Sequence, residues 1–197
     1  MNKIGKNFST NNLGQRKKSD FYETPYSITK QFIDLGCFDN IKSILEPACG
    51  DGAITKVLKD CNFSNITEYD IEKNFLTEDT QFDQIITNPP FSLAAEFILH
   101  AKKIAKERIA FLLPLSYLHG KYRHDYIWSD TTFKLKSVYV FTRYPLLGDK
   151  LREDGRYKTG MMVYAWYLWE KTYEGIPQLH WLDNNMFVLN SNKKTIM

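Results

Sequence analysis

The sequence has few cysteines, and none of them lies in a metal-binding or disulfide-forming pattern. Cys37, Cys49 and Cys61 are odd in number and include no Cys-x-x-Cys pair. This spacing argues against a structural zinc site and a disulfide framework, and it fits the reducing cytoplasm, where we expect the protein. The four histidines are scattered along the chain, so we expect no metal ion.

Long apolar runs are also lacking. No segment approaches the roughly 20 apolar residues of a membrane span, and the first twenty residues contain no apolar core. We therefore expect neither a transmembrane helix nor a signal peptide. Residues 1–19 instead carry five basic residues and no acidic one, although the net charge of the chain is only +3. This composition predicts a flexible basic arm ahead of a single domain over residues 20–197.

Apolar segments alternate with segments of helical periodicity over most of the chain. Strand-like segments cover residues 42–47, 65–71, 82–88, 108–114, 135–145 and 160–171, and residues 178–190 add a short strand or pack as coil. Helical patterns cover residues 25–36, 51–61, 92–107 and 121–130. This order predicts an α/β fold with a Rossmann-like, doubly wound, mostly parallel seven-stranded sheet, of which a third strand between residues 71 and 82 is stunted. The last two long strands follow each other without a helix, which predicts an antiparallel pair at one edge.

A glycine-containing turn, "EPACGDG", joins the first strand to the second helix. Gly50 and Gly52 allow a tight turn and a close approach of the backbone to a ligand, or simply a strand–helix connection. The sequence is neither a P-loop nor a GxGxxG fingerprint. Glu46 and Asp51 would repel a pyrophosphate but suit a cation, and Asp70 ends the second strand, where a carboxylate holds a ribose diol. A cationic, ribose-bearing ligand is S-adenosylmethionine, which we expect as the cofactor.

A second turn, Asn88-Pro89-Pro90-Phe91, follows the strand at residues 82–88. Proline fixes its own φ and restricts the residue before it, so the turn is rigid. It either merely ends the strand or also directs the Asn88 and Pro89 carbonyls and the Phe91 ring at a ligand. Two such acceptors can bond both hydrogens of an amine conjugated to a ring, which exposes the nitrogen lone pair for attack. A cysteine nucleophile is not required, and we expect Cys49 to be packed rather than catalytic.

The order of "DFYETP", "EPACGDG" and "NPPF" resembles class I amino-methyltransferases, in particular N6-adenine DNA methyltransferases whose cofactor motifs precede the catalytic motif. The downstream segments are similar to small phage and prophage members of that group. The resemblance covers residues 20 to about 182. It implies methyl transfer from S-adenosylmethionine to the N6 amine of adenine in DNA. RNA adenine methylation, protein glutamine methylation and a catalytically inactive nucleic-acid-binding relative stay open as alternatives.

The resemblance also implies which residues form the site. The catalytic turn is Asn88, Pro89, Pro90 and Phe91, with Asn88 bordering the cofactor as well. The cofactor-binding set is Tyr22, Thr24 and Pro25 at the methionine end, Glu46, Ala48, Gly50 and Gly52 around the amino-acid portion, Asp70 at the ribose and Ile71 against the adenine. An aromatic side chain, Phe141 or Tyr144, either covers the second face of the target base or fills the core.

The chain departs from the family pattern between Asp70 and Asp83. The family usually has a third strand here, with an acid that bonds the adenine amine of the cofactor. Asn74 stands where this acid is expected, with Asp79 the other candidate, and an Asn carbonyl can accept the same hydrogen bond.

Basic side chains suggest a nucleic-acid partner. Residues 119–158 carry nine Lys or Arg residues against five Asp or Glu residues. We expect phosphate contacts from Arg123, Arg143, Lys150, Arg152, Arg156 and Lys158, unless this stretch is only a solvated loop. We expect no separate target-recognition domain, so that specificity is either loose or built from residues 114–160.

Overall fold

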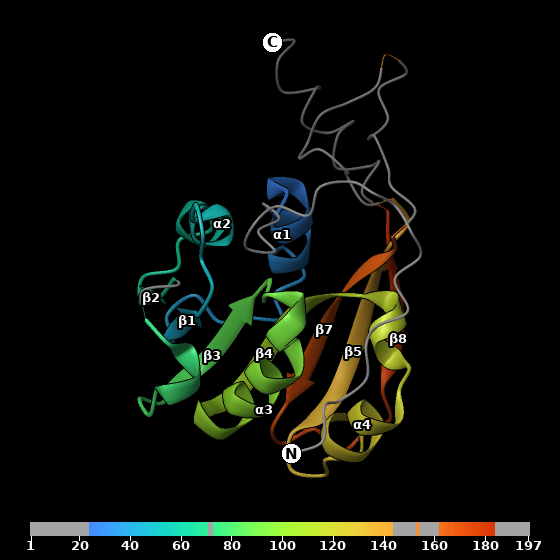
Figure 1. The fold of residues 1–197 in the computed structure, drawn as a ribbon. Coiled ribbons are helices and arrows are strands. Elements are labelled where there is room, and N and C mark those ends of the chain that lie inside the picture. The colour runs from blue at the N-terminus through green and yellow to red at the C-terminus, as the bar shows by residue number, and fades with distance from the viewer. Residues whose placement is uncertain (1–23, 71–72, 144–152, 154–161, 184–197) are drawn as a thin grey trace.

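The computed structural model describes residues 24–70, 73–143, 153 and 162–183. Its centre is a seven-stranded sheet with the strand order β2-β1-β3-β4-β7-β5-β8 (Figure 1). The strands are β1 (Ile44–Glu46), β2 (Ile66–Glu68), β3 (Phe82–Thr87), β4 (Ala105–Pro114), β5 (Lys134–Phe141), β7 (Tyr164–Glu170) and β8 (Gln178–Leu182).

The topology confirms the predicted α/β, Rossmann-like, mostly parallel sheet. Strands β2, β1, β3 and β4 run parallel to one another, whereas β7 is antiparallel to both β4 and β5. The predicted antiparallel pair is therefore β5 and β7. This pair lies one strand inside the edge of the sheet, because β8 pairs in parallel with β5. Of the two alternatives for the segment that begins at residue 178, a short strand or coil, the structure shows a strand over Gln178–Leu182.

Helices cover both faces of this sheet (Figure 1). The α-helices are α1 (Tyr26–Ile33), α2 (Ala53–Asp60), α3 (Ala94–Ile104) and α4 (Lys121–Arg123), and a π-helical turn (His124–Trp128) continues α4. Short 3-10 helices span Phe75–Thr77, Phe91–Leu93 and Leu115–Leu118. The prediction of one helix over residues 92–107 was wrong at its C-terminal end, because the backbone from Ala105 onward pairs with β3.

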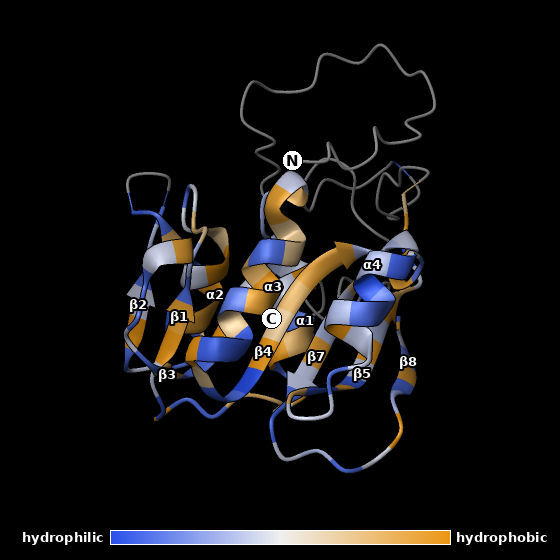
Figure 2. Ribbon diagram, turned by 60° about the horizontal axis from the view of Figure 1, so that its bottom comes forward, coloured by the Kyte–Doolittle hydropathy of each residue, from blue (hydrophilic) through white to orange (hydrophobic). Residues whose placement is uncertain are grey.

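Two hydrophobic cores, one on each face, fix the helices to the sheet. Strand β4 contributes to both cores. Ala110 and Leu112 pack with α1 and α2, whereas Ile109, Phe111 and Leu113 pack with α3. Burial on both faces explains why β4 is hydrophobic along most of its length (Figure 2). On the α1 face, the Trp166 indole donates a hydrogen bond to the Ile28 carbonyl (3.2 Å), and this contact fixes the start of α1 over the sheet.

The described residues between β2 and β3 contain no strand. The chain between β2 and β3 already crosses β1, with which both strands pair in parallel, and the eleven residues 71–81 leave no room for a third strand with a crossover of its own. The 3-10 helix at Phe75–Thr77 stands there instead, and Phe75 is buried against Phe97 with ring centroids 4.8 Å apart. As a result, β2 is the edge strand beside the predicted cofactor site.

Candidate active site

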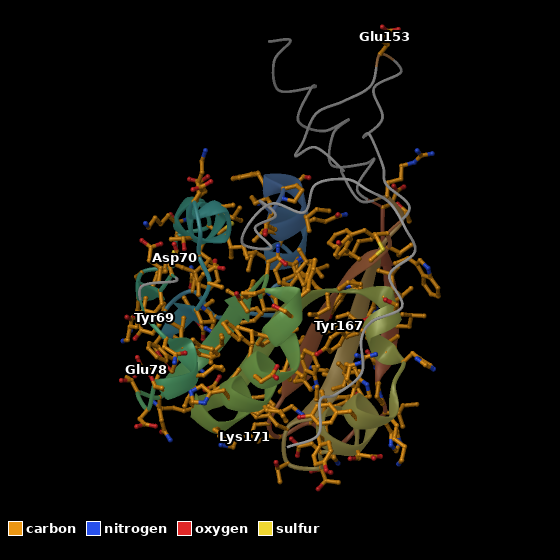
Figure 3. The ribbon with its side chains drawn as sticks, in the orientation of Figure 1. Tyr69, Asp70, Glu78, Glu153, Tyr167 and Lys171 are labelled. Atoms are coloured by element: carbon orange, nitrogen blue, oxygen red, sulfur yellow. The ribbon has the colours of Figure 1, made fainter. Side chains whose placement is uncertain are left out.

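A cavity of about 280 Å³ lies at the carboxyl ends of β1, β2 and β3. The predicted site residues that line it are Thr24, Glu46, Ala48, Gly50, Asp70, Asn74, Asn88, Pro89, Pro90 and Phe91. Asp70 lines it from just beyond the end of β2, and its place in the fold is labelled in Figure 3. The two turns singled out in the sequence therefore border one space, because parallel neighbouring strands end at the same edge of the sheet.

The glycine turn is left-handed at two positions. Gly50 has φ of 49° and Gly52 has φ of 75°, values that glycine adopts without the steric cost of a Cβ atom. The Gly52 amide closes the turn on the Cys49 carbonyl (2.8 Å), and the Cys49 amide donates to the Tyr69 carbonyl at the end of β2 (2.8 Å). These bonds hold the turn rigidly between the ends of β1 and β2.

Glu46 carries a buried carboxyl group at the end of β1. Glu46 is only 1% exposed, and its Oε2 atom has no hydrogen-bond partner among the described residues. Burial, reinforced by the nearby charge of Glu68, raises the pKa of Glu46 well above its ordinary value. An ionised carboxylate in this position requires a cationic or hydrogen-bonding partner from the cavity.

The Asn88 amide is oriented by a residue from another element. Its Nδ2 atom donates a hydrogen bond to the Thr24 hydroxyl (3.0 Å), and Thr24 is buried directly before α1. This bond fixes the plane of the amide and thus the direction of its oxygen. Thr24, predicted as a cofactor contact, lines the cavity and also holds the turn that begins at Asn88.

The proline turn passes directly into a 3-10 helix. Pro90 has φ of −56° and ψ of 121°, and its carbonyl accepts a hydrogen bond from the Leu93 amide (2.9 Å). Phe91, the first residue of that helix, stacks against Tyr164 with ring centroids 5.9 Å apart. Phe141 is 3% exposed and belongs to the core on the α1 face, so it does not cover a ligand.

Cys49 borders the cavity, and its surroundings favour the protonated thiol. Burial, together with the charges of Glu46 and Asp70, raises the pKa of its thiol to about 11. The thiol stays protonated, and thiolate is the reactive form. This agrees with the expectation that Cys49 is a packing residue.

The third-strand region supplies lining residues that the sequence analysis did not identify. They are Lys73, Phe75 and Leu76, and they are joined by Leu93 and Phe97 from the segment after the proline turn. The Asn74 side-chain oxygen, Oδ1, accepts a hydrogen bond from the Leu76 amide (3.1 Å) and so caps the 3-10 helix. The apolar residues of "NFLT" were the available signal, but an isolated pair of apolar residues does not reveal which space it faces.

The other predicted residues either do not line the cavity themselves or fall outside the described residues. Pro25, Gly52, Arg123 and Arg143 are described but do not line it. The Arg123 guanidinium donates to the His119 carbonyl and lies 4.6 Å from the Tyr117 ring. The predictions for residues 1–19, Tyr22, Ile71, Tyr144, Lys150, Arg152, Arg156 and Lys158 lie outside the described residues.

The described part of the chain carries neither a membrane-spanning helix nor a metal-binding cluster. It contains no helix of the length and apolarity that crossing a membrane requires. It also contains no group of three or more His, Cys, Asp or Glu side chains arranged to hold a metal ion.

Comparisons with known proteins show the fold. No family model and no curated protein sequence matches the chain. Among solved structures, a Listeria monocytogenes protein assigned to the class I S-adenosylmethionine-dependent methyltransferases is similar, with a TM-score of 0.54 and 14% identity over 91% of this chain and 72% of that one. The M protein of the type I restriction enzyme EcoKI has a TM-score of 0.52 and 14% identity over 80% of this chain and 45% of that one. TrmN from Thermus thermophilus has a TM-score of 0.51 and 14% identity over 73% of this chain and 48% of that one.

These similarities show that the chain has the α/β fold of class I methyltransferases. The chain spans less than half the length of the EcoKI M protein and of TrmN.

Proposed function

We propose that this chain is an S-adenosylmethionine-dependent methyltransferase that acts on the exocyclic N6 amine of adenine in DNA. One observation carries the proposal: the glycine turn with its buried acid and the Asn-Pro-Pro-Phe turn line a single cavity. The first turn suits a cationic nucleoside, and the second suits an amine that must lose its conjugation with a ring.

The residues around the cavity fit S-adenosylmethionine. The buried Glu46 carboxyl, whose Oε2 atom has no donor among the described residues, would pair with the ammonium of the methionine portion. Asp70 would accept from the ribose hydroxyls, and the apolar side chains of Phe75 and Leu76 would contact the adenine. The cofactor supplies an electrophilic methyl group on a sulfonium.

The protein contributes position and hydrogen-bond acceptors. The Asn88 oxygen and the Pro89 carbonyl would accept the two hydrogens of the target amine and favour a tetrahedral nitrogen, with its lone pair directed at the methyl group. The Thr24 hydroxyl holds the Asn88 amide for this task. Phe91 would stack on the target base.

Among DNA, RNA and protein, we favour DNA as the substrate. The basic residues at 1–19 and 119–158 suit a polyanion rather than a protein. The M protein of a type I restriction enzyme also has this fold. A base inside a duplex cannot reach a recessed cavity, so the adenine must be flipped out or single-stranded.

The test is methyl transfer from labelled S-adenosylmethionine to unmethylated DNA, RNA and protein pools. The proposal expects label in DNA with the wild-type protein and none with Asn88→Ala. If label appeared only in RNA or only in protein, that molecule would replace DNA as the proposed substrate. Failure of the wild-type protein to bind the cofactor in calorimetry would remove the enzymatic proposal altogether.

A further inference from the structure

Strand β8 forms one edge of the sheet, and its outer side pairs with no other described strand (Figure 1). Two of its side chains are apolar and exposed, Leu179 at 50% and Trp181 at 67%. They stand beside Val138 and Val140 of β5, which belong to the core that packs with α3, so both side chains point to that face of the sheet. An exposed apolar pair on an unpaired edge is a surface to which a further strand can add.

The opposite edge of the sheet is protected in ways that are common for edge strands. Strand β2 has only three residues, and it ends at Glu68, whose carboxylate lies 3.9 Å from the Lys59 ammonium. Short length and charge both discourage the addition of a strand. Strand β8 is longer, and Gln178–Leu182 contains no Lys, Arg, Asp, Glu or Pro. Of the two edges, β8 is therefore the one that can accept a partner.

The backbone of β8 directs alternate residues outward. The Leu182 carbonyl accepts a hydrogen bond from the Thr142 amide (3.0 Å), which directly follows β5. Successive residues of a strand direct their N–H and C=O groups to opposite sides. His180 therefore faces β5 as Leu182 does, whereas Leu179 and Trp181 face outward. The outward backbone groups and the exposed apolar side chains thus belong to the same two residues.

We propose that β8 pairs with β8 of a second copy of this chain, antiparallel, about a twofold axis at His180. In this register Leu179 lies opposite the partner's Trp181, and Trp181 lies opposite the partner's Leu179. Both pairs exchange backbone hydrogen bonds and bring apolar side chains together on one face. An axis at Leu179 or at Trp181 would instead place one of these side chains opposite Pro177 or Asp183.

Symmetry and charge favour a second copy as the partner. A twofold interface uses the same surface twice, so a strand with charged side chains would bring like charges together. Gln178–Leu182 carries no Lys, Arg, Asp or Glu, so this repulsion does not arise. The two apolar residues are complementary to each other, and the surface is therefore complementary to its own copy.

The pairing would join two seven-stranded sheets into one continuous sheet. Antiparallel pairing reverses the strand direction, so the two cavities would open at opposite edges of the joined sheet. No residue of β8 lines the cavity. The inference is therefore independent of the proposed function, and a failure of one leaves the other standing.

The first experiment is sedimentation of the full-length protein at concentrations up to about 100 µM, because small interfaces are of the weak class. The wild-type protein should form dimers. Trp181→Lys and Leu179→Lys should each weaken the dimer roughly 30-fold or more, since each change acts in both copies at the centre of the interface. Ile41→Lys is the matched control, because Ile41 is apolar and 76% exposed but lies outside β8, and it should leave the dimer unchanged.

The second experiment tests the register with a new covalent bond. In the proposed pairing the two copies of His180 lie directly opposite each other in a non-hydrogen-bonded pair, where Cβ atoms are about 4.5–5.5 Å apart. His180→Cys should therefore form a disulfide-linked dimer on mild oxidation. His124→Cys, at a side chain that is 73% exposed on another element, is the control and should stay monomeric under denaturing conditions. So should the wild-type protein, whose three cysteines are partly buried.

A wild-type protein that sediments only as a monomer would overturn the proposal, as when another segment of the chain covers β8. A dimer that survives both Trp181→Lys and Leu179→Lys would also overturn it. In the second experiment, the contradicting result is a His180→Cys protein that forms no covalent dimer, or forms one no more readily than His124→Cys.

Discussion

The two turns that border the cavity differ in backbone freedom, because one is built from glycine and the other from proline. The turn after β1 uses Gly50 and Gly52 at positive φ, where the chain can bend closely around a ligand. The turn after β3 uses Pro89 and Pro90, which fix φ near −65° and hold acceptor groups in one direction. From this difference we infer separate roles: the first turn binds the cofactor, and the second directs the reaction. Substitutions should therefore separate affinity for the cofactor from turnover.

The largest effect should come from Asn88→Ala. Loss of one positioned acceptor at the reacting nitrogen should lower kcat by about 10²- to 10³-fold, in the range found for oxyanion-hole groups. The dissociation constant of the cofactor should change only a few-fold. Steady-state kinetics and calorimetry measure the two quantities, and Asn65→Ala, at an exposed position before β2, is the matched control. Equal losses of turnover and of cofactor affinity would contradict the separate roles of the two turns.

Glu46→Gln should produce the opposite pattern. The substitution keeps the shape of the side chain but removes its charge, so the cofactor should bind about 10- to 150-fold more weakly, as for a hydrogen bond to a charged group. At saturating cofactor, kcat should stay near the wild-type value. A reduced kcat with unchanged cofactor affinity would place Glu46 in the reaction instead.

The same variant tests the buried state of Glu46 without any ligand. Burial raises the pKa of Glu46 above its ordinary value of 4.5, so the folded chain binds this proton more tightly than the unfolded chain. The free energy of unfolding of the wild-type protein should therefore fall as the pH rises above 4.5 toward the folded-state pKa. Glu46→Gln should lack this contribution. Urea unfolding at pH 5 and pH 8 measures the free energy of unfolding of both proteins. If this free energy changed equally with pH in the wild-type protein and in Glu46→Gln, the raised pKa of a buried Glu46 would be contradicted.

A comparison of Gly52→Ala with Gly36→Ala should separate the effect of backbone strain in the glycine turn from the effect of strain elsewhere in the fold. Gly52 and Gly36 both have positive φ, 75° and 71°, and an added Cβ atom would meet nothing within 4 Å at either position. Each Ala variant should lose roughly 1–2 kcal/mol in the free energy of unfolding, the cost of a left-handed residue with a side chain. Only Gly52→Ala should also weaken cofactor binding. If Gly36→Ala weakens it equally, the effect belongs to global stability.

Thr24→Val should have the smallest effect. It removes the hydroxyl that accepts from the Asn88 amide and keeps the volume of the side chain. Loss of one neutral hydrogen bond corresponds to about a 2- to 12-fold fall in kcat. Thr131→Val, at an exposed position, is the matched control. A wild-type kcat in Thr24→Val would mean that Asn88 is held by other contacts.

The sequence predicted the parts of the site that depend on local backbone chemistry. Glycine and proline at strand ends identify turns whatever surrounds them, and alternating strands and helices determine that these turns share one edge of the sheet. For this reason Glu46, Asp70 and Asn88 were predicted as one site, and they line one cavity.

Contacts between distant elements could not be predicted in the same way. The stacking of Tyr164 on Phe91 depends on the insertion of β7 beside β4, and the bond from Asn88 to Thr24 depends on how α1 packs. Phe75 lines the cavity because a short connection folds into a 3-10 helix rather than a strand. Each of these features is decided by tertiary packing, which outweighs local sequence preference.

The most direct test of the account is the identity of the product. Unmethylated DNA would be incubated with the protein and S-adenosylmethionine and then digested to nucleosides for mass spectrometry. The account predicts N6-methyladenine with the wild-type protein and its absence with Asn88→Ala. A methyl group on another atom, or equal N6-methyladenine from both proteins, would contradict the assignment of the Asn88 turn as the site of amine methylation.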